Sequence, residues 1–248
     1  MKRMIIIGAG AAGMMCAIKA SDHYDVTIIE KNEKPGKKLY ITGKGRCNVT
    51  NASDEETFLK NVVTNPKFLY SAIYSYNSDM VQSDFESWGV KLKTERGNRV
   101  FPESDHSSDI IRALYEQLKK RNVKVLYNTS VKVILTEVYS DEEKGLLSRV
   151  KGVKFSSKGD KLKNASKVLV ADVVVLTSGG KSYPLTGSTG DGYKMLEKLG
   201  IDIVPARPAL VPLVTKEKYV KNMMGLSLTN VAVKYTASKE DFPSLQNE

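Results

Sequence analysis

The sequence predicts an α/β protein whose first domain is built on a parallel β-sheet. Four apolar residues, Met4–Ile7, stand directly before three closely spaced glycines, as expected of a strand buried on both faces. The run DVTIIE at residues 25–30 predicts a second strand that ends on an acid. A third run, DVVVLTSGG at residues 172–180, predicts a further buried strand that ends in glycines. Such strands, with helical segments between them, are typical of a parallel sheet.

The turn after the first strand has the spacing of a dinucleotide-binding fingerprint. Gly8 permits a tight turn, Gly10 lets the backbone approach a pyrophosphate, and Gly13 lets the next helix pack closely on the sheet. We expect that helix at residues 11–21, with its free N–H groups and positive dipole end facing the phosphates. An ordinary strand–helix turn without a ligand is the alternative, and the strand–helix–strand–acid context makes it the weaker one.

Glu30 stands at the end of the second expected strand, where a carboxylate can accept hydrogen bonds from ribose hydroxyls. No arginine follows Glu30 directly, which favours a ribose with a free 2′-hydroxyl. The glycines and Glu30 together predict a Rossmann-like domain that binds FAD or NAD in preference to NADP.

The composition is that of an ordinary globular protein, with 248 residues of which 41% are hydrophobic and 27% charged. No apolar run is long enough to span a membrane, and the N-terminus begins the first strand at once, so we expect a cytoplasmic protein without a membrane partner. Cys16 and Cys47 are too few for a disulfide framework. The net charge of +10 is compatible with a nucleic-acid partner, but the basic residues are scattered. A basic surface that accompanies an anionic cofactor is therefore favoured.

Residues 42–51, TGKGRCNVTN, alternate glycines with Arg46 and Asn48, so the loop can hydrogen-bond a polar ligand closely. As a bare pattern it could also be a polar surface loop. With MIIIGAGAAGMMCAIKAS at the N-terminus, it resembles the start of the HI0933-like (YhiN/BaiN-type) flavoproteins, which are FAD-dependent oxidoreductases with two dinucleotide-binding domains. The chain matches the signature GKKL-x-x-(S/T)-G-x-G-R-C-N-x-T-N from Gly36 to Asn51.

The resemblance implies that FAD is the cofactor, that Glu30 holds its adenosine ribose, and that Arg46, Cys47 and Asn48 lie beside the flavin. Cys47 could then be a redox or nucleophilic thiol. A structural thiol is favoured, because no second cysteine is near enough in sequence to form a redox pair. NAD(P)H stays open as the electron donor, and the expected substrate is a small molecule that the sequence does not identify.

Residues 53–92 contain regularly placed aromatic residues, which predict short helices that cap the sheet and place these rings in the core. The rings are Phe58, Phe68, Tyr70, Tyr74, Tyr76, Phe85 and Trp88. GNRVFPES at residues 97–104 is similar to the GRVFP-like segment of the family, and we expect His106 to be a surface residue. The segment from Ser108 to Arg121 predicts an amphipathic helix with Ser108 as its N-cap.

Two strands are expected next, at residues 122–126 and 130–136, and then an antiparallel meander over residues 145–170. The resemblance implies that the backbone of Val131 meets the adenine. The strand that ends in Gly179 and Gly180 is similar to the A-T-G-G strand end of the superfamily, with Thr177-Ser178 in place of Ala-Thr, and these glycines should pass near the flavin. SYPLTGSTGDGY at residues 182–193 continues the family pattern, with Asp191 as an acid at a helix N-terminus and a helix at residues 193–199.

The cofactor-binding prediction comprises eighteen positions, whereas we name no catalytic acid or base and expect no metal site. These positions are Gly8, Gly10, Ala11, Ala12, Gly13, Glu30, Lys31, Lys38, Thr42, Gly43, Gly45, Arg46, Cys47, Asn48, Val131, Ser178, Gly179 and Gly180.

Two domains are expected: an FAD-binding domain at residues 1–192 and the beginning of a β-rich substrate-side domain at residues 193–248. PALVPL at residues 208–213 is similar to the segment that enters this second domain in the family, and Gly225–Tyr235 predicts one of its strands. The resemblance covers only the N-terminal portion of a typical member, so we expect the second domain to be truncated. Exposed strand edges would then cause association or partial disorder near its end.

The sequence leaves three hypotheses for the function. The first is an FAD-dependent oxidoreductase acting on a small molecule. The second is a flavoprotein that acts on tRNA or another nucleic acid, since tRNA uridine-modifying flavoproteins share this type of first domain and the chain is basic. The third is a non-catalytic fragment that retains the nucleotide-binding fold without a complete flavin pocket. A dehydrogenase that uses NAD alone has the least support, because the GKGRCN loop is typical of the flavin family.

Overall fold

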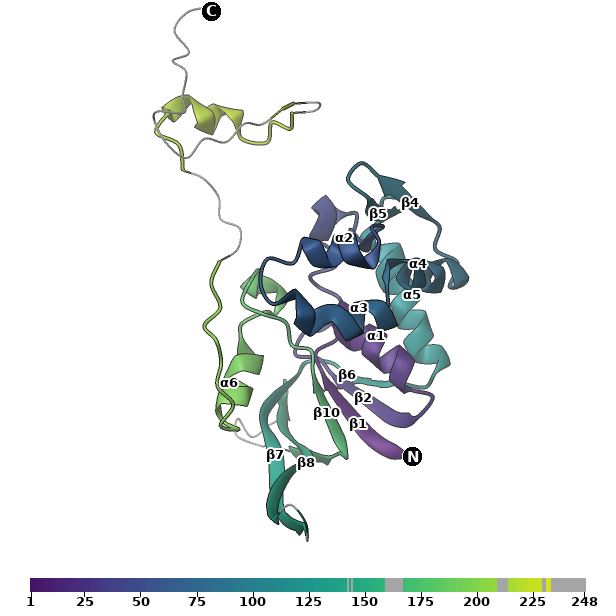
Figure 1. Cartoon of the computed structure of the whole chain (residues 1–248), viewed down its shortest axis with the longest axis vertical. Helices are drawn as coiled ribbons and strands as arrows, with labels where there is room; N and C mark the ends of the chain where they lie inside the picture. Colours follow the sequence, from purple (N-terminus) through teal and green to yellow (C-terminus); the bar gives the residue numbers. More distant parts are fainter. Residues whose placement is uncertain (142, 144, 159–166, 209–213, 229–230, 233–248) are drawn as a thin grey trace, which may run out of the picture. The chain divides into compact units, whose positions relative to one another are not determined.

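A computed structural model describes residues 1–141, 143, 145–158, 167–208, 214–228 and 231–232 (Figure 1). The chain divides into two compact units, Met1–Pro205 and Ala206–Glu248. The strands of the first unit are β1 (Lys2–Ile7), β2 (Tyr24–Ile29), β3 (Thr50–Asn51), β4 (Leu92–Glu95), β5 (Arg99–Pro102), β6 (Lys124–Leu126), β7 (Thr129–Asp141), β8 (Gly145–Ser157), β9 (Lys167–Val170) and β10 (Val173–Leu176). Its α-helices are α1 (Ala11–Ala20), α2 (Glu55–Lys60), α3 (Tyr70–Ser75), α4 (Ser78–Ser87), α5 (Ser107–Lys120) and α6 (Asp191–Glu197), and its 3-10 turns are η1 (Thr42–Gly45), η2 (Pro66–Leu69) and η3 (Pro184–Thr186).

The centre of the first unit is a four-stranded parallel sheet in the order β10-β1-β2-β6. Ile5 of β1 lies opposite Thr27 of β2 on one side and Val174 of β10 on the other. The expected α/β class and the strands expected in the runs at residues 4–7, 25–30 and 172–180 are therefore confirmed. The expectation that β10 is a buried strand is wrong. Its four residues are only half-buried, because the strand lies at the edge of the sheet.

Helices cover one face of this sheet and a β-meander covers the other (Figure 1). Met4 and Ile6 point into a core with α1 and α5, whereas Ile5 and Ile7 point into a second core with the meander and α6. Successive side chains of a strand alternate between its faces, so a strand covered on both sides is continuously apolar. This alternation explains why Met4–Ile7 has no polar residue.

Helix α5 packs on α1 through one apolar face that contains Ile110, Leu114 and Leu118. The helix begins one residue earlier than expected, and its N-cap is His106, whose side chain makes no capping hydrogen bond. The expected N-cap at Ser108 is therefore wrong, because Ser107 and Ser108 both lie within the first turn. His106 is exposed, as expected.

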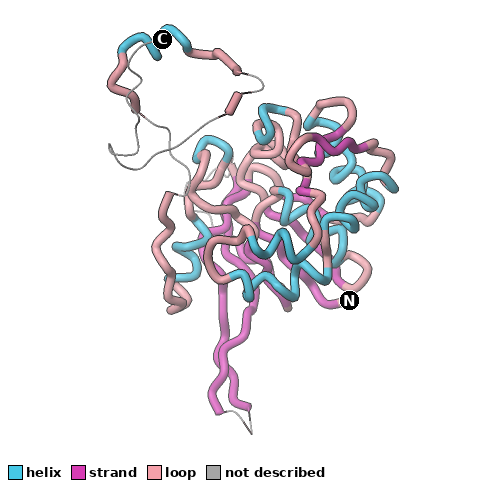
Figure 2. Tube along the Cα trace, turned by 45° about the horizontal axis from the view of Figure 1, so that its top comes forward, coloured by secondary structure: helices cyan, strands magenta, loops and turns pink. Residues whose placement is uncertain are grey.

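The meander is confirmed as an antiparallel sheet in the order β7-β8-β9. Strand β9 pairs only with residues 152–155 of β8, so the outer halves of β7 and β8 continue as a two-stranded arm (Figure 2). Val138 and Leu146 on this arm are exposed. Residues 159–166 of the expected meander lie outside the described residues.

The expected cap of short helices is present as α2, η2, α3 and α4, and it adjoins a small sheet in the order β3-β5-β4. Phe85 of α4 is buried and packs edge-on against Trp88, with ring centroids 5.2 Å apart. The expectation of core positions is wrong for Phe68, Tyr70 and Tyr74, which are 79%, 56% and 42% exposed. Among the cap helices α2, α3 and α4, only α4 contributes a fully buried side chain to the core.

The second unit contains one 3-10 helix, η4 (Lys218–Met223), within its described residues. The strand expected at Gly225–Tyr235 is absent from the part of that segment that the structure describes, and the rest lies outside it. The PALVPL segment falls almost entirely outside the described residues. The β-rich second domain, its boundary at residue 193 and its association therefore stay predictions. Across the described part of the chain, no helix is long and apolar enough to cross a bilayer.

Candidate functional site

A cavity of about 570 Å³ lies in the first unit where β1, β2 and β10 end. Strand β1 lies between β2 and β10, so the connections from these strands diverge at this edge of the sheet. Crevices at the carboxyl ends of parallel strands, at the point where strand order reverses, are the usual ligand sites of doubly wound folds. The position of the cavity therefore follows from the sheet topology.

The three fingerprint glycines meet different constraints. A Cβ atom on Gly13 would lie 1.9 Å from the carbonyl oxygen of Gly8, and one on Gly8, whose φ is +109°, would lie 2.7 Å from the carbonyl oxygen of Thr177. A side chain is therefore excluded at Gly13 by the close approach of α1 to the glycine turn, and at Gly8 by the chain that follows β10. A Cβ atom on Gly10 would meet nothing within 4 Å. Gly10 therefore faces open space in the cavity, where a ligand backbone could approach it.

Helix α1 begins in the wall of the cavity, and Gly10, Ala11 and Ala12 line it. Its first turn has no acidic residue, and its N-cap residue Gly10 makes no side-chain capping bond. The free N–H groups of a first helical turn, together with the helix dipole, stabilise an anion. This end of α1 therefore fits a phosphate or pyrophosphate group.

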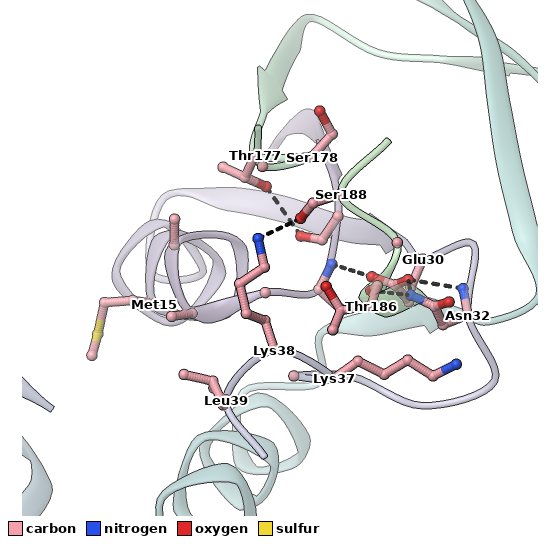
Figure 3. Close-up of a pocket in the computed structure, with 18 of the residues that line it drawn as sticks. Met15, Glu30, Asn32, Lys37, Lys38, Leu39, Thr177, Ser178, Thr186 and Ser188 are labelled. Atoms are coloured by element: carbon pink, nitrogen blue, oxygen red, sulfur yellow. Dashed lines mark hydrogen bonds between the residues drawn. The ribbon is translucent and has the colours of Figure 1, made fainter. Parts of the chain in front are cut away.

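Glu30 is 7% exposed and follows β2 directly. Its carboxylate accepts hydrogen bonds from the Ala9 N–H at 2.7 Å, from the Asn32 N–H at 2.8 Å and from the Asn32 side-chain amide at 2.7 Å (Figure 3). A carboxylate can accept about four hydrogen bonds, so Glu30 retains room for one ribose hydroxyl. Sequence reasoning missed Asn32, although its position two residues after the acid was the available signal.

Two lysines connect the loop after β2 to the loop before α6. Lys38 Nζ donates to Ser188 Oγ at 2.7 Å, and Lys31 Nζ donates to Thr189 Oγ1 at 2.7 Å and to Asp191 Oδ2 at 2.6 Å. The hydrogen bond from Lys31 holds the pKa of Asp191 below its usual range. The site therefore presents cations where an anionic ligand would lie, and Asp191 is the acid expected in the first turn of α6.

Cys47 lines the cavity but is only 1% exposed. Its backbone has a φ of +66°, and burial raises the pKa of its thiol to about 11. A thiol with such a pKa is protonated near neutral pH and is a poor nucleophile. The preference for a structural thiol over a redox one is thereby supported.

Arg46 does not line the cavity. Its guanidinium pairs with Glu95 at 2.8 Å and with Asp105 at 3.3 Å, and it lies 4.0 Å from the centroid of the Phe101 ring. Gly43 belongs to the same loop, and a Cβ atom there would lie 2.8 Å from the backbone nitrogen of Asn48. These residues shape the loop that presents Cys47 and Asn48 to the cavity.

The cavity has a polar end and an apolar end. Glu30 and Asn32 lie on one side of it, and Met15 and Leu39 lie on the other, with Lys38 between them (Figure 3). Tyr76, whose hydroxyl lies 3.4 Å from Met15 Sδ, and apolar side chains from α1, α4 and α5 also line the cavity; these residues are Met15, Tyr76, Val81, Phe85, Ile110 and Leu114. Sequence reasoning placed none of these in the site, because amphipathic helices offer the same apolar pattern whether they line a core or a cavity.

Most of the predicted cofactor-binding residues come together around the cavity. Those that line it are Gly8, Gly10, Ala11, Ala12, Glu30, Lys31, Lys38, Thr42, Cys47, Asn48, Val131, Ser178 and Gly179. Those that do not line it are Gly13, Gly43, Gly45, Arg46 and Gly180. For the second group, direct contact with a ligand stays a prediction that the geometry does not favour.

Comparison with known proteins identifies the chain. The HI0933-like protein Rossmann domain matches residues 2–242. The chain is 31% identical to 3-dehydro-bile acid delta(4,6)-reductase of Clostridium scindens over 220 residues, which are 88% of this chain and 48% of that protein. It is 29% identical to ribosomal RNA dihydrouridine synthase of Haemophilus influenzae over 228 residues, which are 90% of this chain and 52% of that protein. The chain thus spans about half the length of the curated relatives it matches.

Among solved structures, the open conformation of a flavocytochrome c3 fumarate reductase superposes with a TM-score of 0.59. The match covers 80% of this chain and 40% of the reductase chain, at 21% sequence identity. At this identity the likeness establishes the fold alone.

Proposed function

The chain belongs to the HI0933-like protein family, and from this premise we propose that it binds FAD in the cavity and works as an FAD-dependent oxidoreductase. One observation carries the proposal: the open space before Gly10, the free first turn of α1 and the buried Glu30 all face the same cavity. In a Rossmann fold, the glycine turn and the first turn of the helix bind the pyrophosphate of a dinucleotide, and an acid after the second strand binds its ribose.

The polar end of the cavity supplies the residues that would hold FAD. The backbone from Gly8 to Ala12 would bind its pyrophosphate, Lys38 would contribute positive charge, Glu30 would accept a hydrogen bond from the ribose, and Val131 would contact the adenine. When bound, the flavin supplies the electron-transfer chemistry, and the protein supplies binding, orientation and electrostatics. NAD(P)H is our proposed electron donor.

We assign the substrate class from chemistry that the relatives' names share. A 3-oxo steroid with a neighbouring double bond and a uracil ring both contain a carbon–carbon double bond conjugated to a carbonyl. Reduction of such a bond by a flavin is the reaction that we propose for this chain. The apolar end of the cavity, with side chains such as Met15 and Phe85, suits the flat ring that carries such a bond.

The absorption spectrum of the purified protein, recorded before and after incubation with excess FAD and removal of free flavin, tests the proposal. A retained flavin spectrum is the expected result, and anaerobic bleaching by NADPH or NADH would identify the donor. Gly10→Ala is the matched variant, because its Cβ enters the open space without touching protein atoms. A colourless protein at saturating FAD would contradict the proposal and favour a nucleotide-binding fold without a complete flavin pocket.

A second candidate is the reduction of uridine in RNA. The name of the Haemophilus influenzae relative and the net charge of +10 favour it. Binding of an RNA oligonucleotide, measured at several salt concentrations, separates the two candidates. An affinity that falls steeply with salt indicates phosphate contacts and supports RNA, whereas no binding at low salt leaves the small-molecule substrate.

A further inference from the structure

Three side chains from three different elements form a hydrogen-bonded cluster beside the apolar end of the cavity. The Tyr76 hydroxyl, at the C-terminal end of α3, donates to Asp84 Oδ2 of α4 at 2.5 Å. Lys19 Nζ of α1 pairs with the same carboxylate oxygen at 2.6 Å and lies 4.9 Å from the centroid of the Tyr76 ring. The cluster thus joins the cap helices to α1.

Tyr76 is the member of this cluster that faces the cavity. Its hydroxyl is 3.4 Å from Met15 Sδ, and Met15 lines the cavity at the end away from Glu30 (Figure 3). Tyr76 also lines a second pocket together with Lys19 and Asp84. Tyr76 therefore belongs to the walls of both spaces.

The cluster fixes more than one ring. Asp84 lies between Val81 and Phe85 along α4, and both of these residues line the cavity. Breaking the bond from Tyr76 to Asp84 would leave the ring free to turn and would loosen the contact between the end of α3 and α4. Desolvation and the neighbouring Asp84 carboxylate raise the pKa of the Tyr76 hydroxyl, so it stays a hydrogen-bond donor throughout the physiological pH range.

We infer that the Tyr76 ring is the surface on which a flat conjugated carbonyl substrate binds, and that Asp84 and Lys19 are positioning residues that hold this ring in place. The inference rests on the proposed function for the class of substrate. Glu30 and the glycine turn account for the ribose and the pyrophosphate at the polar end, which leaves the Met15 end of the cavity for flat rings, namely that of the flavin and that of a substrate beside it. A flat ring gains most from an aromatic face that is already held in one orientation.

The emission of Trp88 provides a test that does not depend on turnover. Trp88 is the single tryptophan, and it packs on Phe85, which lines the cavity. The dissociation constants of 4-androstene-3,17-dione and of uridine monophosphate are measured by this emission, with and without FAD. We expect the wild type to bind at least one of the two probes, and Tyr76→Phe to bind it about fivefold more weakly.

The matched control is Tyr74→Phe, the same change on the exposed side of α3, which should leave probe binding unchanged. Asp84→Ala should weaken probe binding as Tyr76→Phe does, Asp84→Asn should restore part of the loss, and the double variant Tyr76→Phe/Asp84→Ala should show no further loss. The FAD dissociation constant should stay within about twofold in all of these variants.

Failure to bind either probe would overturn the inference, as would Tyr76→Phe binding as tightly as the wild type. A loss of FAD affinity instead of probe affinity would also overturn it, because Tyr76 would then contact the cofactor. The flavin spectrum of the wild type decides the proposed function separately, since the probe titration is also performed without FAD.

Discussion

The Glu30 end and the Tyr76 end of the cavity differ in what fixes their walls. At the Glu30 end, the walls include the backbone of the glycine turn and a carboxylate that accepts three hydrogen bonds, and these groups come from the first 32 residues. At the Tyr76 end, the wall is made of side chains, and its orientation depends on a cluster that joins residues 19, 76 and 84. The first end is rigid by local geometry, whereas the second can be altered by single side-chain changes. Such a division lets one nucleotide-binding scaffold accept different substrates.

Among the substitutions that test the rigid end, we expect Gly13→Ala to have the largest effect on stability. In Gly13→Ala the new Cβ would lie 1.9 Å from the Gly8 carbonyl oxygen, so we expect the free energy of unfolding to fall by about 3 kcal/mol or more. Gly10→Ala is the matched control, because its Cβ meets no atom within 4 Å. It should change stability by about 1 kcal/mol or less. Urea denaturation measures both variants, and equal stability of the two would show that α1 does not pack as described.

Cys47 tests whether the region between the two ends is chemically inert. Because burial raises the pKa of its thiol from 9.0 to about 11, the thiolate fraction near neutral pH is about a hundredfold lower than for an unperturbed cysteine. We expect iodoacetamide to label Cys47 at least about a hundredfold more slowly than a free thiol, with a rate that rises as the pH approaches 11. Peptide mass spectrometry separates it from the half-buried Cys16. Rapid labelling of Cys47 at neutral pH would restore the hypothesis of a reactive thiol.

Glu30→Gln alters the hydrogen bonding of the rigid end without changing its shape. One carboxylate oxygen becomes an amide that faces N–H donors, which we expect to cost about 1–3 kcal/mol of folding stability and to weaken FAD binding. Glu33→Gln is the control, since Glu33 is exposed and forms a surface ion pair with Lys37. Denaturation and FAD titration measure both variants. A Glu30→Gln protein as stable as the wild type would mean that the hydrogen bonds from Ala9 and Asn32 to the carboxylate do not contribute to folding stability.

The smallest effect is expected at Asp191, which closes the loop over the polar end. Because its pKa is held below the ordinary value of about 3.9, its contribution to stability is present above that value and is lost as the pH falls through the lower pKa of the folded protein. The carboxylate is 41% exposed, so screening reduces the contribution of the pair. We expect Asp191→Asn to cost about 0.5 kcal/mol at pH 7 and less in high salt. A cost that does not decrease as the pH is lowered below about 3.9 would contradict this origin.

Local chain order explains which parts of the site could be predicted from the sequence. The fingerprint glycines and Glu30 act through neighbours within about one strand–helix–strand unit, so their spacing is sufficient to place them. The GKGRCN signature identified the family, but it did not distinguish Cys47 and Asn48, which line the cavity, from Arg46, which pairs with Glu95 and Asp105. That choice depends on acids 49 and 59 residues away from Arg46.

The sequence by itself determined the parallel sheet, the glycine turn with Glu30 at the end of β2, and membership of the HI0933-like family, because each is encoded in contiguous residues. Tertiary structure alone decided that Arg46 pairs with Glu95 and Asp105, that Tyr70 and Tyr74 face solvent, and that Tyr76 faces the cavity. Helix α4 carries apolar residues both in the core and on the surface, and its packing against the core that contains α1 selects which of its side chains line the site. A contact such as that between Lys19 and Asp84 joins residues far apart in the chain, and its formation depends on the free energy of the whole packed core.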